Sequence, residues 1–269
     1  MRIAWLLLSV SLVGACATSP TGRSQLMLVS PDQAVVASRQ AYLAQIGELD
    51  KQGKLAQDPE LLKWIENITS RLVAQAVAMR PDTSKWEWSV AVIDDPEVVN
   101  AWCMAGGRMA IYTGLIRKVD PTEDELAQVM AHEIAHALAN HTAEKMSVAM
   151  ASQAGVLAAA VVSDRPGAAV AGAALAAQLA IELPNSRTAE SEADQIGIEL
   201  AAKAGFDPSA AATLWQKMGR VGGSAPPQFM STHPAPQNRE QSLRQRALAL
   251  MPVYRSATNP PKYPVRIVT

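Results

Sequence analysis

The stretch AQVMAHEIAHALANH, residues 127–141, holds three of the four histidines of the chain. His132 and His136 are four residues apart, so on an α-helix both rings leave the same face, one turn from each other. Glu133 lies beside them. Upstream, Thr122 and Glu125 have the spacing of a capping box, which predicts that this helix begins there. The sequence therefore predicts a helix that directs two imidazoles and a carboxylate toward one region.

A His-Glu-x-x-His helix suits a zinc site. Two neutral imidazoles can bind the ion, and the carboxylate between them is close enough to act on the water instead of the metal. Zinc lowers the pKa of its water to about 7, so Glu133 can serve as the general base when that water attacks a carbonyl group. The five-residue pattern also occurs by chance on solvated helix faces. The rest of the chain must therefore supply a third ligand.

The segment NSRTAESEADQIGIEL, residues 185–200, offers that ligand. Glu190 and Asp194 are again four apart, so a second helix can direct Glu190 at the metal while Asp194 accepts the outer N–H of a ligand histidine. Two histidines and one glutamate leave the fourth position open for water, as a catalytic zinc requires. The alternative is an exposed acidic helix face, because Glu192 and Glu199 lie in the same segment.

A different zinc-protease pattern is excluded. It needs a third histidine six residues after the second with a glycine between them, and here those positions are Thr142 and Ala139. His141 is one residue short and would lie about 140° round the helix from His136. We therefore interpret His141 as a histidine at the helix end, close to the negative end of the helix dipole.

The N-terminus predicts export and a lipid anchor. Arg2 precedes the apolar run IAWLLLSVSLVGA, and LVGAC ends at Cys16, which is the arrangement of a bacterial lipoprotein signal peptide. The run is too short to span a bilayer. An ordinary signal peptide and a buried helix are the alternatives. Ala17, in place of Asp, predicts a location at the outer membrane facing the periplasm, so membrane contact would be through lipid on Cys16.

Composition sets further bounds. The chain has 269 residues, 49% of them hydrophobic, which is enough for one large domain or two small ones. A net charge of −1 gives no electrostatic case for nucleic acid as a partner. If Cys16 carries lipid, Cys103 is the remaining cysteine and no intramolecular disulfide can form.

Hydrophobic periodicity predicts an α+β fold in which helices dominate. Helices are expected at residues 31–52, 60–79, 144–162, 167–182, 186–204, after Pro208 and near 237–249. Strands are expected within KWEWSVAVI, residues 85–93, and GRMAIYT, residues 107–113, which follows a turn at Gly106 and Gly107. The apolar runs at 146–162 and 167–181 are each too short for a membrane span. They could be buried helices, a lid over the site or a hairpin that dips into the membrane.

Four segments together carry a family resemblance. NAWCMAGGRMAIYTGLI, HEIAH, SRTAESEAD and STHPAPQNR occur in that order between residues 100 and 239. They resemble the HtpX and Oma-type zinc metallopeptidases, membrane-associated gluzincins related to the type I CaaX prenyl proteases, and in particular small bacterial lipoprotein members. The resemblance implies one zinc ion per chain, bound by His132, His136 and Glu190, with Glu133 as the base. Ala105 departs from the pattern, since a proline commonly precedes the two glycines.

The resemblance also implies roles outside the ligand set. His233 should lie near the metal, where it either donates a hydrogen bond to the oxyanion or occupies the open zinc position as a latch. Arg187 and Arg239 are weaker candidates for pairing with Asp194 or other carboxylates of the site. The domain organisation follows as a signal peptide at 1–15, a tether at 16–30, a zinc metallopeptidase domain at 31–252 and a Pro-rich C-terminal tail at 253–269.

Substrate binding is predicted at the strand before the histidine helix. An extended polypeptide can bind by adding a strand to an exposed sheet edge, and residues 107–113 are predicted to form that edge. Gly107, Met109 and Ile111 would contact substrate, with Gly107 allowing close backbone approach. Asn100 would hydrogen-bond the substrate main chain or cap a turn.

We therefore expect a lipid-anchored zinc endopeptidase of the cell envelope that hydrolyses unfolded or misassembled proteins. The alternative is a periplasmic chaperone or outer-membrane assembly factor with little proteolytic turnover. A structural zinc protein is a third reading, but it would need four closed ligands. The sequence does not specify an oligomeric state.

Overall fold

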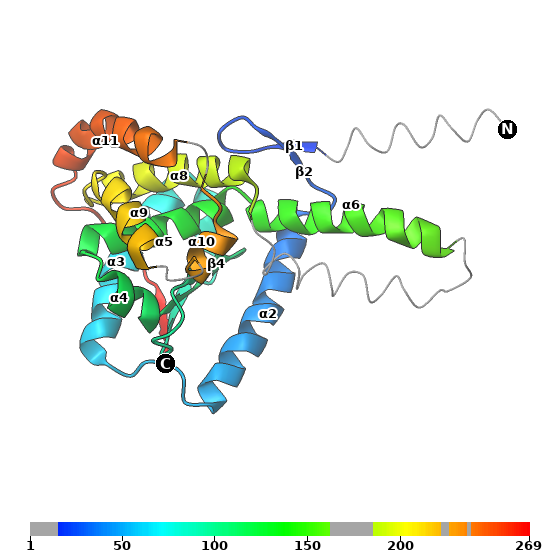
Figure 1. The fold of residues 1–269 in the computed structure, drawn as a ribbon, viewed down its shortest axis with the longest axis horizontal. Coiled ribbons are helices and arrows are strands. Elements are labelled where there is room, and N and C mark those ends of the chain that lie inside the picture. The colour runs from blue at the N-terminus through cyan, green and yellow to red at the C-terminus, as the bar shows by residue number, and fades with distance from the viewer. Residues whose placement is uncertain (1–15, 162–184, 222–225, 236–237) are drawn as a thin grey trace.

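The computed structural model describes residues 16–161, 185–221, 226–235 and 238–269 (Figure 1). The described part is mainly helical with two small sheets, which confirms the predicted α+β class. Its elements are β1 (Cys16–Thr18), β2 (Ser24–Leu26), α2 (Pro31–Lys51), α3 (Pro59–Met79), the short 3-10 helix η2 (Pro81–Lys85), β3 (Ser89–Ile93), β4 (Ala101–Met104), β5 (Arg108–Tyr112), α4 (Thr113–Val119), α5 (Glu123–Leu138), α6 (His141–Val161), α8 (Arg187–Lys203), α9 (Ala210–Val221), α10 (Gln228–Thr232), α11 (Arg239–Ser256) and β6 (Arg266–Val268).

The larger sheet separates two apolar cores. Its strand order is β4-β5-β3-β6, with β4 antiparallel to β5 and the other pairs parallel. Successive side chains of a strand point to opposite faces. Val90, Val92, Met109 and Ile111 accordingly join the core under α3 and α5, whereas the residues between them pack against α2. These are Ala91, Ile93 and Ala110, in contact with Tyr42 and Ile46.

Two sequence predictions about the sheet are wrong in detail. The strand at 107–113 is not the edge, because β5 lies between β4 and β3. The edge strands are β6 and β4. The sequence analysis did not predict the strand at residues 101–104. Both faces of β5 are buried except at Tyr112, as expected for an interior strand. The predicted C-terminal tail also belongs to the sheet, since α11 runs to Ser256 and residues 266–268 pair with β3 as β6.

Helix α5, which carries the histidine motif, lies at the centre of the domain. The capping box is confirmed: Thr122 Oγ1 accepts from the Glu125 backbone N–H at 3.2 Å, and the Glu125 carboxylate accepts from the Thr122 N–H at 2.9 Å. All residues from Glu125 to Leu138 are buried. Helix α8 approaches α5 closely at Gly197, where a Cβ would lie 3.0 Å from the backbone of His132. This contact brings the acidic side chains of α8 to the histidines.

The start of the described chain folds onto the domain. Residues 16–30 were predicted to be a polar tether, but β1 and β2 form an antiparallel hairpin beside α6 (Figure 1). Ser30 caps α2 with Pro31 at its first position, as predicted. Residues 1–15 and the apolar run at 167–181 lie outside the described residues, so the signal-peptide and lid predictions are not addressed. No helix within the described ranges is long and apolar enough to cross a membrane.

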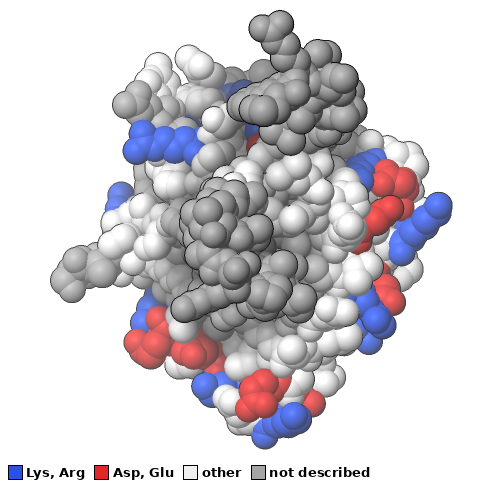
Figure 2. All heavy atoms as spheres, turned by 90° about the vertical axis from the view of Figure 1, so that its right-hand side faces the viewer, with Lys and Arg blue, Asp and Glu red and all other residues white. Residues whose placement is uncertain are grey.

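Figure 2 shows the face toward which α6 projects in Figure 1. Among the described residues on this face, basic and acidic side chains lie intermixed around the margin and no field of a single sign is visible. Charge on this view therefore does not mark a binding surface, and the candidate site is found in the buried polar residues instead.

Candidate metal centre

Four side chains from three helical segments meet in the interior of the domain. His132 and His136 come from α5, Glu190 from the first turn of α8, and His233 from the residue after α10. One nitrogen or oxygen atom from each lies within 4.8 Å of all the others, and all four residues are buried. The structure thus brings together the three predicted ligands and places His233 beside them.

The distances within the cluster fit a tetrahedral metal ion. His132 Nε2 lies 3.1 Å from His136 Nε2, 3.2 Å from Glu190 Oε2 and 3.3 Å from His233 Nδ1. Ligand atoms at about 2.0–2.1 Å from a tetrahedral zinc are separated by about 3.3 Å. Glu190 Oε2 is buried without a hydrogen-bond partner, which is costly unless a cation satisfies it. The donor set and its spacing therefore suit zinc.

The electrostatics of the cluster also suit a cation. Burial opposes protonation of His132, but the negative charges of Glu190 and Asp194 outweigh it and raise the pKa of His132 to about 9. Burial likewise opposes ionisation of Glu190, but the two histidines hold its pKa well below the usual range. Burial lowers the pKa of His136, so this ring stays neutral. The metal-free site therefore carries a proton on His132, which a bound metal ion would displace.

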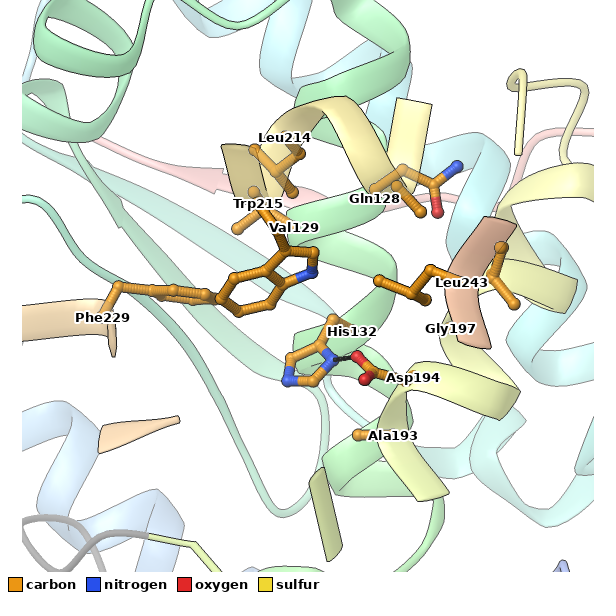
Figure 3. Close-up of a pocket in the computed structure, with 12 residues that line it drawn as sticks. Gln128, Val129, His132, Ala193, Asp194, Gly197, Leu214, Trp215, Phe229 and Leu243 are labelled. Atoms are coloured by element: carbon orange, nitrogen blue, oxygen red, sulfur yellow. Dashed lines mark ion pairs between the residues drawn. The ribbon is translucent and has the colours of Figure 1, made fainter. Parts of the chain in front are cut away.

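The outer side of His132 is held by α8 and α11. Asp194 Oδ1 lies 3.1 Å from His132 Nδ1, the contact predicted from its spacing after Glu190. Arg239 Nη2 donates to the same carboxylate oxygen at 2.6 Å, and its guanidinium lies 3.4 Å from the centre of the Trp215 ring. Figure 3 shows the His132–Asp194 contact at the edge of a small apolar pocket walled by Trp215 and Phe229. These contacts fix the ring orientation of His132.

The two arginine predictions come out differently. Arg187 is exposed at the start of α8 and makes no hydrogen bond or ion pair within the described part of the chain, so its predicted place beside the ligands is wrong. Arg239, which was predicted only as a weaker candidate, is 5% exposed and pairs with Asp194. Arg187 is the first residue of α8 and lies on its exposed side. Arg239 is the first residue of α11, which packs on α8.

Glu133 and His233 face each other across the cluster. His233 Nε2 lies 3.3 Å from Glu133 Oε1, and the His233 ring stacks on Phe229 with centroids 4.5 Å apart. Glu133 Oε1 is buried without a hydrogen-bond partner. Burial raises the pKa of Glu133, with the charges of His233 and His132 opposing the shift. A carboxylate in this state is suited to accept a proton near neutral pH.

A cleft with a volume of about 740 Å³ reaches the cluster. Residues 100–104, which contain β4, form part of its wall opposite Glu133 and His136, and Lys145 from α6 also lines it. Asn100 lies in this wall, and its Oδ1 accepts from the Ala101 backbone N–H. Of the other predicted substrate contacts, Met109 and Ile111 are 0% exposed in the core, and Gly107, at φ +79°, packs against Trp88. None of the three lines the cleft, because β5 is an interior strand and the side chains of Met109 and Ile111 point into the core under α3 and α5.

Sequence reasoning missed two residues next to the cluster. His141 Nδ1 lies 2.8 Å from His136 Nδ1, and His141 Nε2 lies 3.2 Å from Glu192 Oε2. The predicted 140° angle assumed one continuous helix, but α5 ends at Leu138 and Asn140 adopts a left-handed conformation with φ +56°. A new helix, α6, then starts at His141 and turns its ring back toward His136. Glu192 was named only in the alternative of an exposed acidic helix face, and it is 4% exposed.

Comparison with known proteins agrees with this geometry. Residues 59–247 match peptidase family M48. The chain belongs to this family. It is 38% identical over 185 residues to the mitochondrial metalloendopeptidase OMA1 of Arabidopsis thaliana, covering 68% of this chain and 36% of the relative. It is also 34% identical over 205 residues to the putative beta-barrel assembly-enhancing protease of Vibrio cholerae, covering 73% and 41%, and 31% identical over 234 residues to the mitochondrial metalloendopeptidase OMA1 of Bos taurus, covering 83% and 44%.

The family match confirms the resemblance to Oma-type metallopeptidases, and the His-Glu-x-x-His residues lie in the cluster that could hold the metal. The aligned parts amount to less than half of the length of each of these relatives. Their names therefore describe larger proteins, and the substrate and the location of this chain are matters for proposal.

Proposed function

We propose that the chain is a zinc-dependent endopeptidase that hydrolyses unfolded or misassembled proteins of the cell envelope. One observation carries the proposal: the buried carboxylate of Glu133 adjoins a His132–His136–Glu190 donor set at the base of a cleft that has the edge strand β4 as one wall. A metal site, a base and a surface for extended polypeptide are the three parts that peptide hydrolysis requires.

The metal ligands, Glu133 and β4 have separate roles in the proposed hydrolysis. His132, His136 and Glu190 would hold one zinc ion, which when bound polarises a carbonyl oxygen and acidifies water. Glu133 accepts the proton of the attacking water and passes it to the leaving amine. On the described part of β4, the side away from β5 is unpaired, so its backbone can bind a substrate strand and place the scissile bond beside Glu133.

His233 has two candidate roles. Its Nδ1 lies 3.0 Å from Glu190 Oε1, within the metal cluster, which supports a latch that fills the fourth ligand position. Its Nε2 lies 3.3 Å from Oε1 of Glu133, the proposed base, and both residues line the cleft, which supports the oxyanion role. We favour the latch, because an oxyanion donor would not need to lie among the metal ligands.

The proposed substrate class rests on the cleft and on the relatives. A site this deep admits an extended chain more readily than a folded domain. The relatives from Vibrio cholerae and Escherichia coli are named for beta-barrel assembly, which supports envelope proteins as substrates. A chaperone with little turnover remains the second candidate, since a closed set of four ligands would keep hydrolysis slow.

Hydrolysis of unfolded casein by the full chain and its Glu133→Gln variant, at equal measured zinc content, tests the proposal. The variant should retain zinc and lose about 10²- to 10⁴-fold in rate, since it lacks the base. Equal rates in the two proteins would contradict the assigned mechanism. If both are inactive, complementation of an envelope defect by Glu133→Gln would identify the chaperone alternative, because client binding does not need the base.

The lipid anchor is a separate part of the proposal and rests on the LVGAC box alone. The Cys16→Ala variant should move from the membrane fraction to the soluble fraction of cells, because the lipid is attached through its thiol. Cys103→Ala is the matched control, since Cys103 is buried in β4 and is the only other cysteine of the sequence. An unchanged membrane fraction for Cys16→Ala would reject the anchor and leave the peptidase proposal intact.

A further inference from the structure

The outer nitrogen of His136 has a partner unlike that of His132. His136 Nε2 faces the cluster, 3.3 Å from Glu190 Oε1, and its Nδ1 lies 2.8 Å from His141 Nδ1. His132 instead meets a carboxylate directly, through Asp194. An imidazole that binds a metal through Nε2 must carry its hydrogen on Nδ1, so the state of His141 decides whether this geometry is maintained.

With a neutral His141 ring, the hydrogen bonds on its two sides have a defined direction. An ionised Glu192 can only accept, so His141 Nε2, 3.2 Å from Glu192 Oε2, carries the hydrogen and donates it. In the neutral ring His141 Nδ1 is then an acceptor and receives the N–H of His136 Nδ1. His136 Nε2 is left with a free lone pair that points to the metal position. Each step fixes the next one.

His136, His141, Glu192 and Arg23 form a row of hydrogen-bonded side chains. The carboxylate of Glu192 in this row is held by the N-terminal hairpin. Thr21 Oγ1 donates to Glu192 Oε1 at 2.6 Å, and Arg23 Nε donates to Glu192 Oε2 at 2.9 Å. The Glu192 side chain is 3% exposed and that of Arg23 is 19% exposed. A buried carboxylate of this kind is stabilised only while its donors stay in place. The hairpin therefore lies at the far end of a row of polar groups that reaches a metal ligand.

We propose that Arg23, Glu192 and His141 are positioning residues that fix the tautomer and orientation of His136, so that docking of the N-terminal hairpin strengthens metal binding. The inference rests on the proposed zinc site. It goes beyond that site because it connects the segment that directly follows Cys16 to the affinity of the metal centre. Displacement of the hairpin would weaken one ligand while Asp194 continues to hold the other histidine.

The structure supplies a matched control for this connection. Arg23 also pairs with Glu144 on α6, through contacts of 2.6 and 2.7 Å. Glu144 receives a further hydrogen bond from Gln25. Its charge acts on His141 through space, but among the described residues it makes no hydrogen bond or ion pair with His141 or His136. Glu144→Gln therefore weakens one partner of the same arginine but leaves the contacts of Thr21 and Arg23 with Glu192 in place, so the hairpin can stay docked. Glu192→Gln disturbs the hairpin and the row together.

Zinc affinity and a metal spectrum test the proposal independently of proteolysis. The full chain and its variants are stripped of metal, and the zinc Kd is measured at fixed pH by competition with a chromophoric chelator. Glu192→Gln should weaken zinc binding by about 10- to 100-fold, the range typical of such supporting groups. Glu144→Gln should stay within about threefold of the wild type. The visible spectrum of the cobalt-substituted protein should change only in Glu192→Gln, because the His136 ring is reoriented.

The possible outcomes distinguish a failure of this inference from a failure of the proposed zinc-dependent function. A folded Glu192→Gln protein with the wild-type Kd and cobalt spectrum would overturn the inference alone. An equal loss in Glu144→Gln and Glu192→Gln would also overturn it, because it would show that hairpin docking acts by another route. A wild type that binds no zinc would reject the proposed function together with the inference. If Glu192→Gln does not fold, Arg23→Met tests the same row from its exposed end and should weaken the Kd several-fold.

Discussion

The two sides of the metal cluster are built differently. His132, His136 and Glu190 project from helices of 16 and 17 residues that pack closely at Gly197. His233 follows a helix of five residues and is held by its stack on Phe229 and by polar contacts with Glu190 and Glu133. Three of the donors are thus fixed by a pair of long helices, whereas the fourth belongs to a short segment. We call these the fixed side and the movable side of the site, because the proposed latch requires His233 to leave the cluster.

The largest effect is expected from removal of a ligand on the fixed side. Glu190→Ala should abolish stoichiometric zinc, because it leaves two histidines without the negative donor. The fold should persist, since the buried charge that needs compensation disappears with the substitution. Atomic absorption measures the loss of zinc, and circular dichroism measures whether the fold is retained. Glu199→Ala is the control on the same helix, at a partly exposed position that pairs with Lys203. A Glu190→Ala protein with one zinc per chain would remove Glu190 from the ligand set.

An intermediate effect is expected from the contact between α5 and α8. Gly197→Ala places a methyl group 3.0 Å from the His132 backbone, so the helices must separate at a cost of about 1–3 kcal/mol in the free energy of unfolding. The zinc Kd should weaken in parallel, because Glu190 moves with α8. Urea denaturation and chelator competition measure these quantities.

Gly219→Ala is the matched control for that substitution. Nothing lies within 4 Å of the added methyl group in α9, so this change should stabilise the protein by about 0.4–1 kcal/mol. If both substitutions change the free energy of unfolding in the same direction, the close helix contact does not hold the ligands in place.

The fixed side of the site was largely predictable from the sequence, and the movable side was not. The four-residue spacings of His132/His136 and Glu190/Asp194 report one helix face each, and helices of this length keep that geometry in the fold. His233 was placed through family resemblance, because no periodicity describes a loop. His141 was missed because one left-handed residue, Asn140, separates two helices, and a helical angle has no meaning across such a break.

The sheet likewise shows that a local pattern predicts a strand but not its neighbours. The apolar run of β5 predicted a strand correctly, yet its interior position depends on β4, an unpredicted four-residue strand just upstream, and on β3 at its other side. An edge strand and an interior strand differ in their neighbours more than in their own residues. The edge of the sheet was therefore predicted one strand too far in.

The smallest and most informative effect concerns the movable side. His233→Ala frees the fourth ligand position, so hydrolysis of unfolded casein should rise several-fold while the zinc Kd weakens only modestly, since three ligands remain. Ser231→Ala is the control, because it alters the same short helix at an exposed position and should leave both quantities unchanged. A plain fall in turnover with zinc retained would instead assign His233 to the oxyanion, where loss of one donor removes transition-state stabilisation. The direction of the change in rate therefore decides whether His233 restrains the enzyme or takes part in the reaction.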